Sequence, residues 1–112
     1  MQFGMLTREE KGETTVIYID GRLDVNLSNA IEEQLTGIIR DSQVKKVLIN
    51  LKSVEYMSSS GLRMLVAVTR EAQSEEKSIS LCELNKAVVK LFEVVELDDL
   101  FTIYETEAEA LK

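Results

Sequence analysis

Short strand-like segments alternate with helix-like segments along this chain, and this alternation limits the fold more than any other feature of the sequence. The clearest strand signal is Val47–Leu51, a short and almost wholly apolar run that is typical of a central strand buried on both faces. Apolar residues recur at helical spacing before it, over residues 27–38, and after it, over residues 62–69. Strands that alternate with helices indicate a mostly parallel sheet, because each helix carries the chain back to begin the next strand.

The expected sheet has four to five strands. The candidate strands are Phe3–Arg8, Thr14–Asp20, Val47–Leu51, Ser78–Cys82 and Phe101–Tyr104. A polar turn at residues 9–13 joins the first two segments, which predicts an antiparallel hairpin. After Asp20 the chain is expected to leave the sheet, and residues 52–57 are expected to form a connection.

Helices are expected to complete the order strand-strand-helix-strand-helix-strand-helix-strand-helix. They are predicted from about Asn26 to Arg40, from the serine triplet at 58–60 to the charged turn at 74–77, from the N-cap Asn85 to Val95, and over residues 105–112. We therefore predict a single α/β domain over residues 1–112, with an antiparallel N-terminal strand in an otherwise parallel sheet.

The composition excludes several kinds of chemistry. The chain has no histidine and one cysteine, which excludes Ser-His-Asp and Cys-His catalysis, histidine metal sites and an internal disulfide. Cys82 lies in an apolar stretch and is expected to be a small core residue. The scattered carboxylates Asp20, Asp24 and Glu55 are expected to be turn and cap residues, and no glycine-rich phosphate loop is present. No catalytic residue, metal site or cofactor is therefore predicted.

The net charge of -7 bears on the choice of partner. It argues against direct contact with nucleic acid and is compatible with a basic partner protein. No apolar run approaches the roughly 20 residues of a membrane span, and residues 1–10 lack the apolar core of a signal peptide. The expected location is therefore the cytoplasm, and the acidic charge favours a monomer when the protein is free.

Ser58, Ser59 and Ser60 precede Gly61 at a junction between a strand and a helix. The simplest interpretation is that one serine caps the helix and the others belong to a surface loop. A second interpretation is a phosphorylation switch, because a phosphate of about -1.5 to -2 charges at a helix start can spoil a docking surface without unfolding the domain. A serine nucleophile is a third and weaker interpretation, since no histidine is present to act as its base.

Three segments resemble those of one known family, in the same order and at similar spacing. Met57–Arg63, which follows the central strand, resembles the signature of the STAS domain and, more narrowly, of the bacterial anti-sigma factor antagonists. Gly21–Asp24 is similar to the family's Gly-x-Leu/Ile-Asp turn. Leu97–Phe101 with Tyr104–Thr106 is similar to its closing segment, with Glu96 where glycine is common. The resemblance covers nearly the whole chain and implies the STAS fold.

This resemblance implies a binding protein rather than an enzyme. In the family, the unphosphorylated protein binds an anti-sigma factor, which is often also a serine kinase, and the sigma factor is thereby released. The kinase phosphorylates a serine at the start of the second helix, binding is lost, and a phosphatase restores it. The implied partners are an anti-sigma factor with serine kinase activity and a serine phosphatase.

The family pattern also implies which residues form the site. The phosphorylated serine lies two places before glycine, which is Ser59 here, and Asp24 matches an aspartate on the partner-facing side. Ser58 stands where the family usually has aspartate, so Ser58 and Ser60 remain alternative positions for the phosphate. The expected partner-binding residues are Asp24, Ser58, Ser59, Ser60, Gly61 and Arg63.

Two other functions remain open on the sequence alone. One is a STAS interaction module in a partner-switching pathway whose output is not a sigma factor, which the sequence does not separate from an antagonist. The other is a small hydrolase or nucleotide-binding domain, against which the absence of histidine and of a phosphate loop argues.

Overall fold

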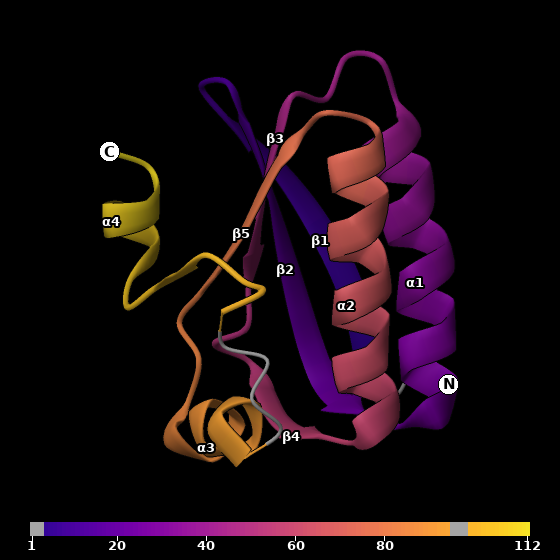
Figure 1. Cartoon of the computed structure of the whole chain (residues 1–112), viewed down its shortest axis with the longest axis vertical. Coiled ribbons are helices and arrows are strands. Elements are labelled where there is room, and N and C mark those ends of the chain that lie inside the picture. The colour runs from indigo at the N-terminus through magenta and orange to yellow at the C-terminus, as the bar shows by residue number, and fades with distance from the viewer. Residues whose placement is uncertain (1–3, 95–98) are drawn as a thin grey trace.

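The computed structural model describes residues 4–94 and 99–112 of the chain (Figure 1). The helices and strands in this part are β1 (Gly4–Lys11), β2 (Thr14–Leu23), α1 (Val25–Arg40), β3 (Lys46–Asn50), β4 (Val54–Met57), α2 (Ser59–Ser74), β5 (Ser78–Cys82), α3 (Lys86–Val94), β6 (Ile103–Tyr104) and α4 (Glu107–Ala110). Some residues used in the sequence analysis lie outside the described part, namely Phe3, Val95, Glu96, Leu97 and Asp98.

The strands form one mixed sheet in the order β1-β2-β3-β5-β6 (Figure 1). β1 is antiparallel to β2, whereas β2 with β3, β3 with β5, and β5 with β6 are parallel pairs. The apolar run of the central strand is buried as expected, with Val47, Leu48 and Ile49 all inaccessible to solvent or nearly so. The prediction of a mostly parallel α/β sheet with an antiparallel N-terminal strand is confirmed.

β4 is the main difference from the predicted sheet, because the sequence predicts a connection over residues 52–57. Val54–Met57 instead pairs in parallel with the end of β2, beyond the point where β3 stops, which makes the sheet six-stranded. β2 accordingly continues to Leu23 and does not end at Asp20. A strand of four residues is too short to show an apolar period, so only its pairing with β2 identifies it.

The three longer helices lie close to their predicted positions, whereas the last elements are shorter than predicted. α1 begins at Val25, after its N-cap Asp24, and ends at Arg40, in agreement with the predicted helix from about Asn26 to Arg40. Asn85 precedes α3 as predicted, and its Oδ1 accepts the N–H of Val88 at 2.9 Å. The last strand and the last helix are shorter than predicted, with two and four residues.

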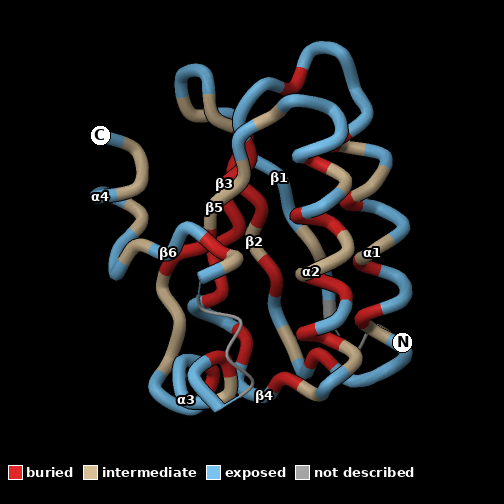
Figure 2. Tube along the Cα trace, viewed as in Figure 1, coloured by how far each residue is buried: buried red, intermediate tan, exposed pale blue. Residues whose placement is uncertain are grey.

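The helices α1 and α2 lie side by side on one face of the sheet (Figure 1). Buried residues such as Ile31 and Leu35 turn the apolar side of α1 inward, and Figure 2 shows the buried positions on the helices facing the sheet. Successive strand residues point to opposite faces. A smaller cluster of Val16, Leu48 and Cys82 therefore belongs to the opposite face of the sheet.

Charged side chains hold the C-terminal ends of α1 and α2 together. The Arg40 guanidinium donates to the Glu71 carboxylate at 2.8 Å and 3.4 Å. The Lys77 ammonium, from the turn after α2, donates to the carbonyls of Ile39 and Asp41, the latter at 2.7 Å. A helix end leaves such carbonyls without partners inside the helix. Lys77 therefore caps the end of α1 from the neighbouring turn.

We expect Lys77→Met to lower the free energy of unfolding by about 1–3 kcal/mol, because the carbonyls at the end of α1 lose their charged donor. Lys45→Met is the matched control, since Lys45 is an exposed lysine in the nearby loop. Urea denaturation followed by circular dichroism measures both variants. Equal stability of the two would show that Lys77 does not hold the end of α1.

Candidate functional site

The ends of two parallel strands bring the predicted site residues together. Leu23 at the end of β2 pairs with Met57 at the end of β4, and a helix follows each strand at once. The helices α1 and α2 therefore begin at the same end of the sheet (Figure 1). Asp24 and Ser58, which follow the two strands, are the N-caps of these helices.

Ser58 fastens the start of α2 to the end of β2. Its hydroxyl donates to the Leu23 carbonyl oxygen at 2.7 Å, and its backbone N–H donates to the same oxygen at 2.9 Å. The hydroxyl oxygen also accepts the N–H of Gly61 at 3.3 Å, which satisfies a free amide of the first helical turn. Ser58 is therefore the cap that the sequence predicted within the triplet, and its hydroxyl both donates and accepts.

The next two serines differ from Ser58 in position and exposure. Ser59 is the first residue of α2 and is exposed, whereas Ser60 is half-buried. Of the three adjacent side chains, the one at Ser59 is the most open to an approaching protein.

The start of α2 approaches the end of β2 closely at Gly61. A Cβ atom at this position would lie 2.8 Å from Met57 Cγ, 3.0 Å from Leu23 Cβ and 3.1 Å from the Leu23 carbonyl oxygen. These distances are too short for ordinary contact between non-bonded atoms, so any larger residue would push α2 away from the sheet. The glycine therefore lets Ser58 reach the Leu23 carbonyl.

Asp24 and Arg63 supply the charges of the site. The Asp24 Oδ1 accepts the N–H of Leu27 at 2.9 Å, and the residue is exposed. Arg63 is also exposed and lies four positions after Ser59, so the two side chains occupy the same face of α2, one turn apart. The site thus combines an exposed hydroxyl, a carboxylate and a guanidinium, which suits binding and modification.

Comparison with known proteins identifies the family to which this arrangement belongs. A sequence model described as the STAS domain matches residues 5–110. The chain belongs to the STAS domain family. This STAS domain is 31% identical over 94 residues to the anti-sigma-B factor antagonist of Staphylococcus aureus (strain NCTC 8325 / PS 47), over 83% of this chain and 86% of that protein.

Solved structures of SpoIIAA are similar to this STAS domain over nearly the whole chain. The anti-sigma factor antagonist SpoIIAA in its unphosphorylated form gives a TM-score of 0.79 at 25% identity, covering 96% of this chain and 93% of that one. The Bacillus cell fate determinant SpoIIAA in the phosphorylated form gives a TM-score of 0.73 at 24% identity, covering 96% of each chain. The STAS fold implied by the sequence is thereby confirmed.

The STAS domain brings all six expected partner-binding residues to one end of the sheet and places two other carboxylates within strands. The expected partner-binding residues lie at the starts of α1 and α2, namely Asp24, Ser58, Ser59, Ser60, Gly61 and Arg63. Asp20 lies within β2 and Glu55 within β4, so the expectation that both are turn or cap residues is wrong. The cause is the pairing of β2 with β4, which extends the sheet over both positions.

Arg22 and Tyr56 lie near the caps and were not singled out in the sequence. The Arg22 guanidinium carbon lies 4.4 Å from the centre of the Tyr56 ring, and Tyr56 is 43% exposed. The two residues are partners in the register of β2 and β4. The pair could have been predicted only if residues 54–57 had been identified as a strand. It adds apolar surface and positive charge beside the site.

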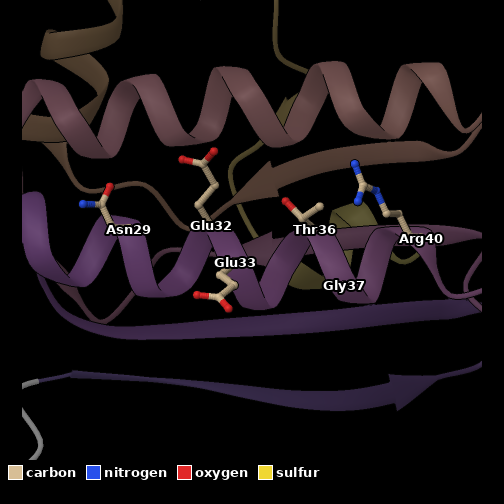
Figure 3. A pocket seen from close by; sticks show the side chains of 6 residues that line it. All are labelled: Asn29, Glu32, Glu33, Thr36, Gly37 and Arg40. Atoms are coloured by element: carbon tan, nitrogen blue, oxygen red, sulfur yellow. The ribbon is translucent and has the colours of Figure 1, made fainter.

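An open hollow of about 490 Å³ follows the outer side of α1 (Figure 3). Asn29, Glu32, Thr36 and Arg40 point towards α2 along it, and Glu33 points away. None of the expected site residues lines this hollow, so it is separate from the serines.

Cys82 is buried as the sequence predicts. Burial raises the pKa of its thiol to about 12, so little thiolate forms near neutral pH. Residues 4–94 and 99–112 contain no group of three or more His, Cys, Asp or Glu side chains placed to hold a metal ion. Within the same residues, no helix has both the length and the apolar character needed to cross a membrane.

Gly61→Ala is expected to lower the free energy of unfolding by about 1–3 kcal/mol, because the added methyl group meets Met57 and Leu23. Gly37→Ala in α1 is the matched control, since nothing lies within 4 Å of the added atom. It should be neutral or stabilising by up to about 1 kcal/mol. Thermal unfolding of both variants tests this, and a Gly61→Ala protein as stable as the parent would contradict the close approach.

Ser58→Ala is expected to lower the free energy of unfolding by about 1–2 kcal/mol, because α2 loses its cap and its bond to Leu23. Ser59→Ala should change it by less than about 0.5 kcal/mol, since the residue is exposed. Urea unfolding of the two alanine variants gives the comparison. If Ser59→Ala lowered the free energy of unfolding as much as Ser58→Ala, the conclusion that Ser58 alone supports the fold would be wrong.

Proposed function

We propose that this STAS domain is an anti-sigma factor antagonist that phosphorylation of Ser59 switches off. The observation that carries the proposal is the exposed Ser59 side chain at the start of α2, in a chain 31% identical to a named anti-sigma-B factor antagonist. In the unphosphorylated state, the starts of α1 and α2 bind the anti-sigma factor, and the sigma factor is released.

The three serines are unequal targets for a kinase, which supports Ser59 as the modified residue. The Ser58 hydroxyl must break its bonds with Leu23 and Gly61 before it can accept a phosphate. Ser60 is half-buried, whereas Ser59 is exposed and is not the cap of the helix. SpoIIAA, which is 25% identical, is described in an unphosphorylated form, and this supports phosphate as a regulated feature of such proteins.

A phosphate on Ser59 stops binding without unfolding the domain in this proposal. It brings about -1.5 to -2 charges to the N-terminal end of α2, where the helix dipole stabilises negative charge. A partner seated on the same surface has to strip water from that dianion, which is costly unless a cation meets it. The Asp24 carboxylate, exposed at the start of α1, increases the local negative charge further. The loss therefore falls on the complex rather than on the fold.

The charges of the surface define the partner that it fits. The Asp24 carboxylate would pair with a basic group on the partner, and the Arg63 guanidinium would pair with an acidic group. The net charge of -7 favours a partner that is basic overall. We assign to this partner the serine kinase activity, and to a separate phosphatase the removal of the phosphate. The chain itself acts as their substrate in the cytoplasm and is not an enzyme in this proposal, in keeping with its lack of histidine.

Ser59→Asp is expected to weaken the complex with the anti-sigma factor about tenfold or more, because a fixed negative charge must be buried in the interface. Ser59→Ala should bind as the parent does but should no longer be released when kinase and ATP are added. Ser42→Asp is the control for added charge, since Ser42 is exposed in the loop after the far end of α1. Isothermal titration calorimetry with the purified anti-sigma factor measures the affinity of all three variants, and repeating it after incubation with kinase and ATP measures release.

Two results would count against the proposal. If Ser59→Asp bound the anti-sigma factor as tightly as Ser42→Asp does, negative charge at Ser59 would not control binding. If peptide mass spectrometry mapped the phosphate to Ser58 or Ser60, the modified residue would not be Ser59. Affinity capture that returns a kinase with no link to a sigma factor would instead support a STAS module with another output.

A further inference from the structure

The C-terminal helix α4 lies across the sheet from α1 and α2 (Figure 1). It has four residues, its N-cap is Thr106, and none of its residues is buried. Near it lies the smaller apolar cluster of Val16, Leu48 and Cys82, and Ala110 and Leu111 pack against that cluster together with Tyr18 of β2 and Tyr104 of β6. A helix this short does not persist without outside contacts, so these contacts decide whether α4 stays in place.

Glu107 supplies most of the polar contacts of α4 with the sheet. Its Oε2 accepts the Lys11 ammonium of β1 at 2.6 Å, and its Oε1 accepts the Asn50 amide of β3 at 2.9 Å. Its backbone N–H donates to the Glu83 carboxylate, just after β5, at 2.8 Å. Burial works to raise the pKa of Glu107, but the hydrogen bonds from Lys11, Asn50 and Tyr18 and the charge of Lys11 together keep the pKa below its ordinary value. The charged form is therefore the one that holds the helix.

The apolar contacts between α4 and the sheet are less complete than the polar contacts of Glu107. A hollow of about 180 Å³ remains between the helix and the sheet, lined among others by Leu48, Ser80, Thr102 and Ala110. Space without packed atoms forfeits the contacts that hold a buried surface together. The main core forms a separate cluster on the other face of the sheet, so it does not depend on α4.

We propose that α4 is a releasable strap, latched by Glu107, and that its release uncovers the apolar cluster Val16, Leu48 and Cys82 while the rest of the domain stays folded. The released state is the minor state of an equilibrium within the free domain, and the cluster lies on the sheet face away from α1 and α2.

Cys82 makes the release measurable without any label. It is the one cysteine of the chain and is fully buried within the cluster that α4 partly covers. Alkylation of its thiol needs an opening that admits the reagent, so the rate of reaction at fixed pH reports the population of open molecules.

The test is the rate of iodoacetamide alkylation of the intact protein, followed by intact-mass spectrometry at several low urea concentrations. Glu107→Gln should react about tenfold faster or more, since the charged partner of Lys11 and Asn50 is lost. Glu109→Gln is the matched control, because it removes the same charge from an exposed position of the same helix, and it should stay within about twofold of the parent. The rate should depend weakly on urea, because little surface is exposed when only α4 leaves.

Two results would overturn the strap. One is an equal rate in Glu107→Gln and Glu109→Gln, and the other is a urea dependence in every variant as steep as that of global unfolding. A Glu107→Gln protein that fails to fold would also count against it, unless Lys11→Met, which removes the ammonium from β1, folds and reacts faster than the parent.

Discussion

The contact between the Leu23 carbonyl and Ser58 is the interaction on which the rest of this STAS domain depends. One oxygen at the end of β2 receives both the hydroxyl and the N–H of Ser58, at 2.7 Å and 2.9 Å. Gly61 makes the contact possible, because a side chain there would collide with Leu23 and Met57. Since the contact joins the sheet to the first turn of α2, the direction of that helix and the exposure of Ser59 both follow from it.

In the proposed switch, Ser58 supports the fold and the adjacent Ser59 carries the regulation. The cap at Ser58 contributes about 1 kcal/mol to the start of α2, and that contribution is in place whether or not its neighbour is modified. A phosphate on Ser59 adds negative charge where the helix dipole favours it. The two states of the proposed switch therefore share one fold and differ in the charge of one surface, which makes the change reversible without refolding.

The sequence predicts correctly those helices and strands whose pattern of apolar residues is contained within the element itself. β5 has its predicted ends and β3 is displaced by one residue, because residues 78–82 alternate between serine and apolar side chains and residues 47–51 form a short apolar run. β4 could not be predicted, since its identity comes from pairing with β2. The family motif points to six candidate site residues that lie at one end of the sheet, but the capping role of Ser58 depends on Leu23, which is 35 positions away. The Arg22–Tyr56 contact and the hydrogen bonds of Glu107 also join residues that are far apart in the sequence, so they leave no local pattern.

The helices α1 and α2 run in the same direction, with both starts at the site and both ends tied by Arg40, Glu71 and Lys77. In the proposed switch, a kinase and a phosphatase that act on Ser59 would both have to approach the same small end of the domain. The two enzymes would then be unable to bind one molecule at the same time. A phosphorylated molecule would have to leave its kinase before a phosphatase could reach it, so the supply of unbound domain, as well as the affinity of either enzyme, would set the pace of recycling.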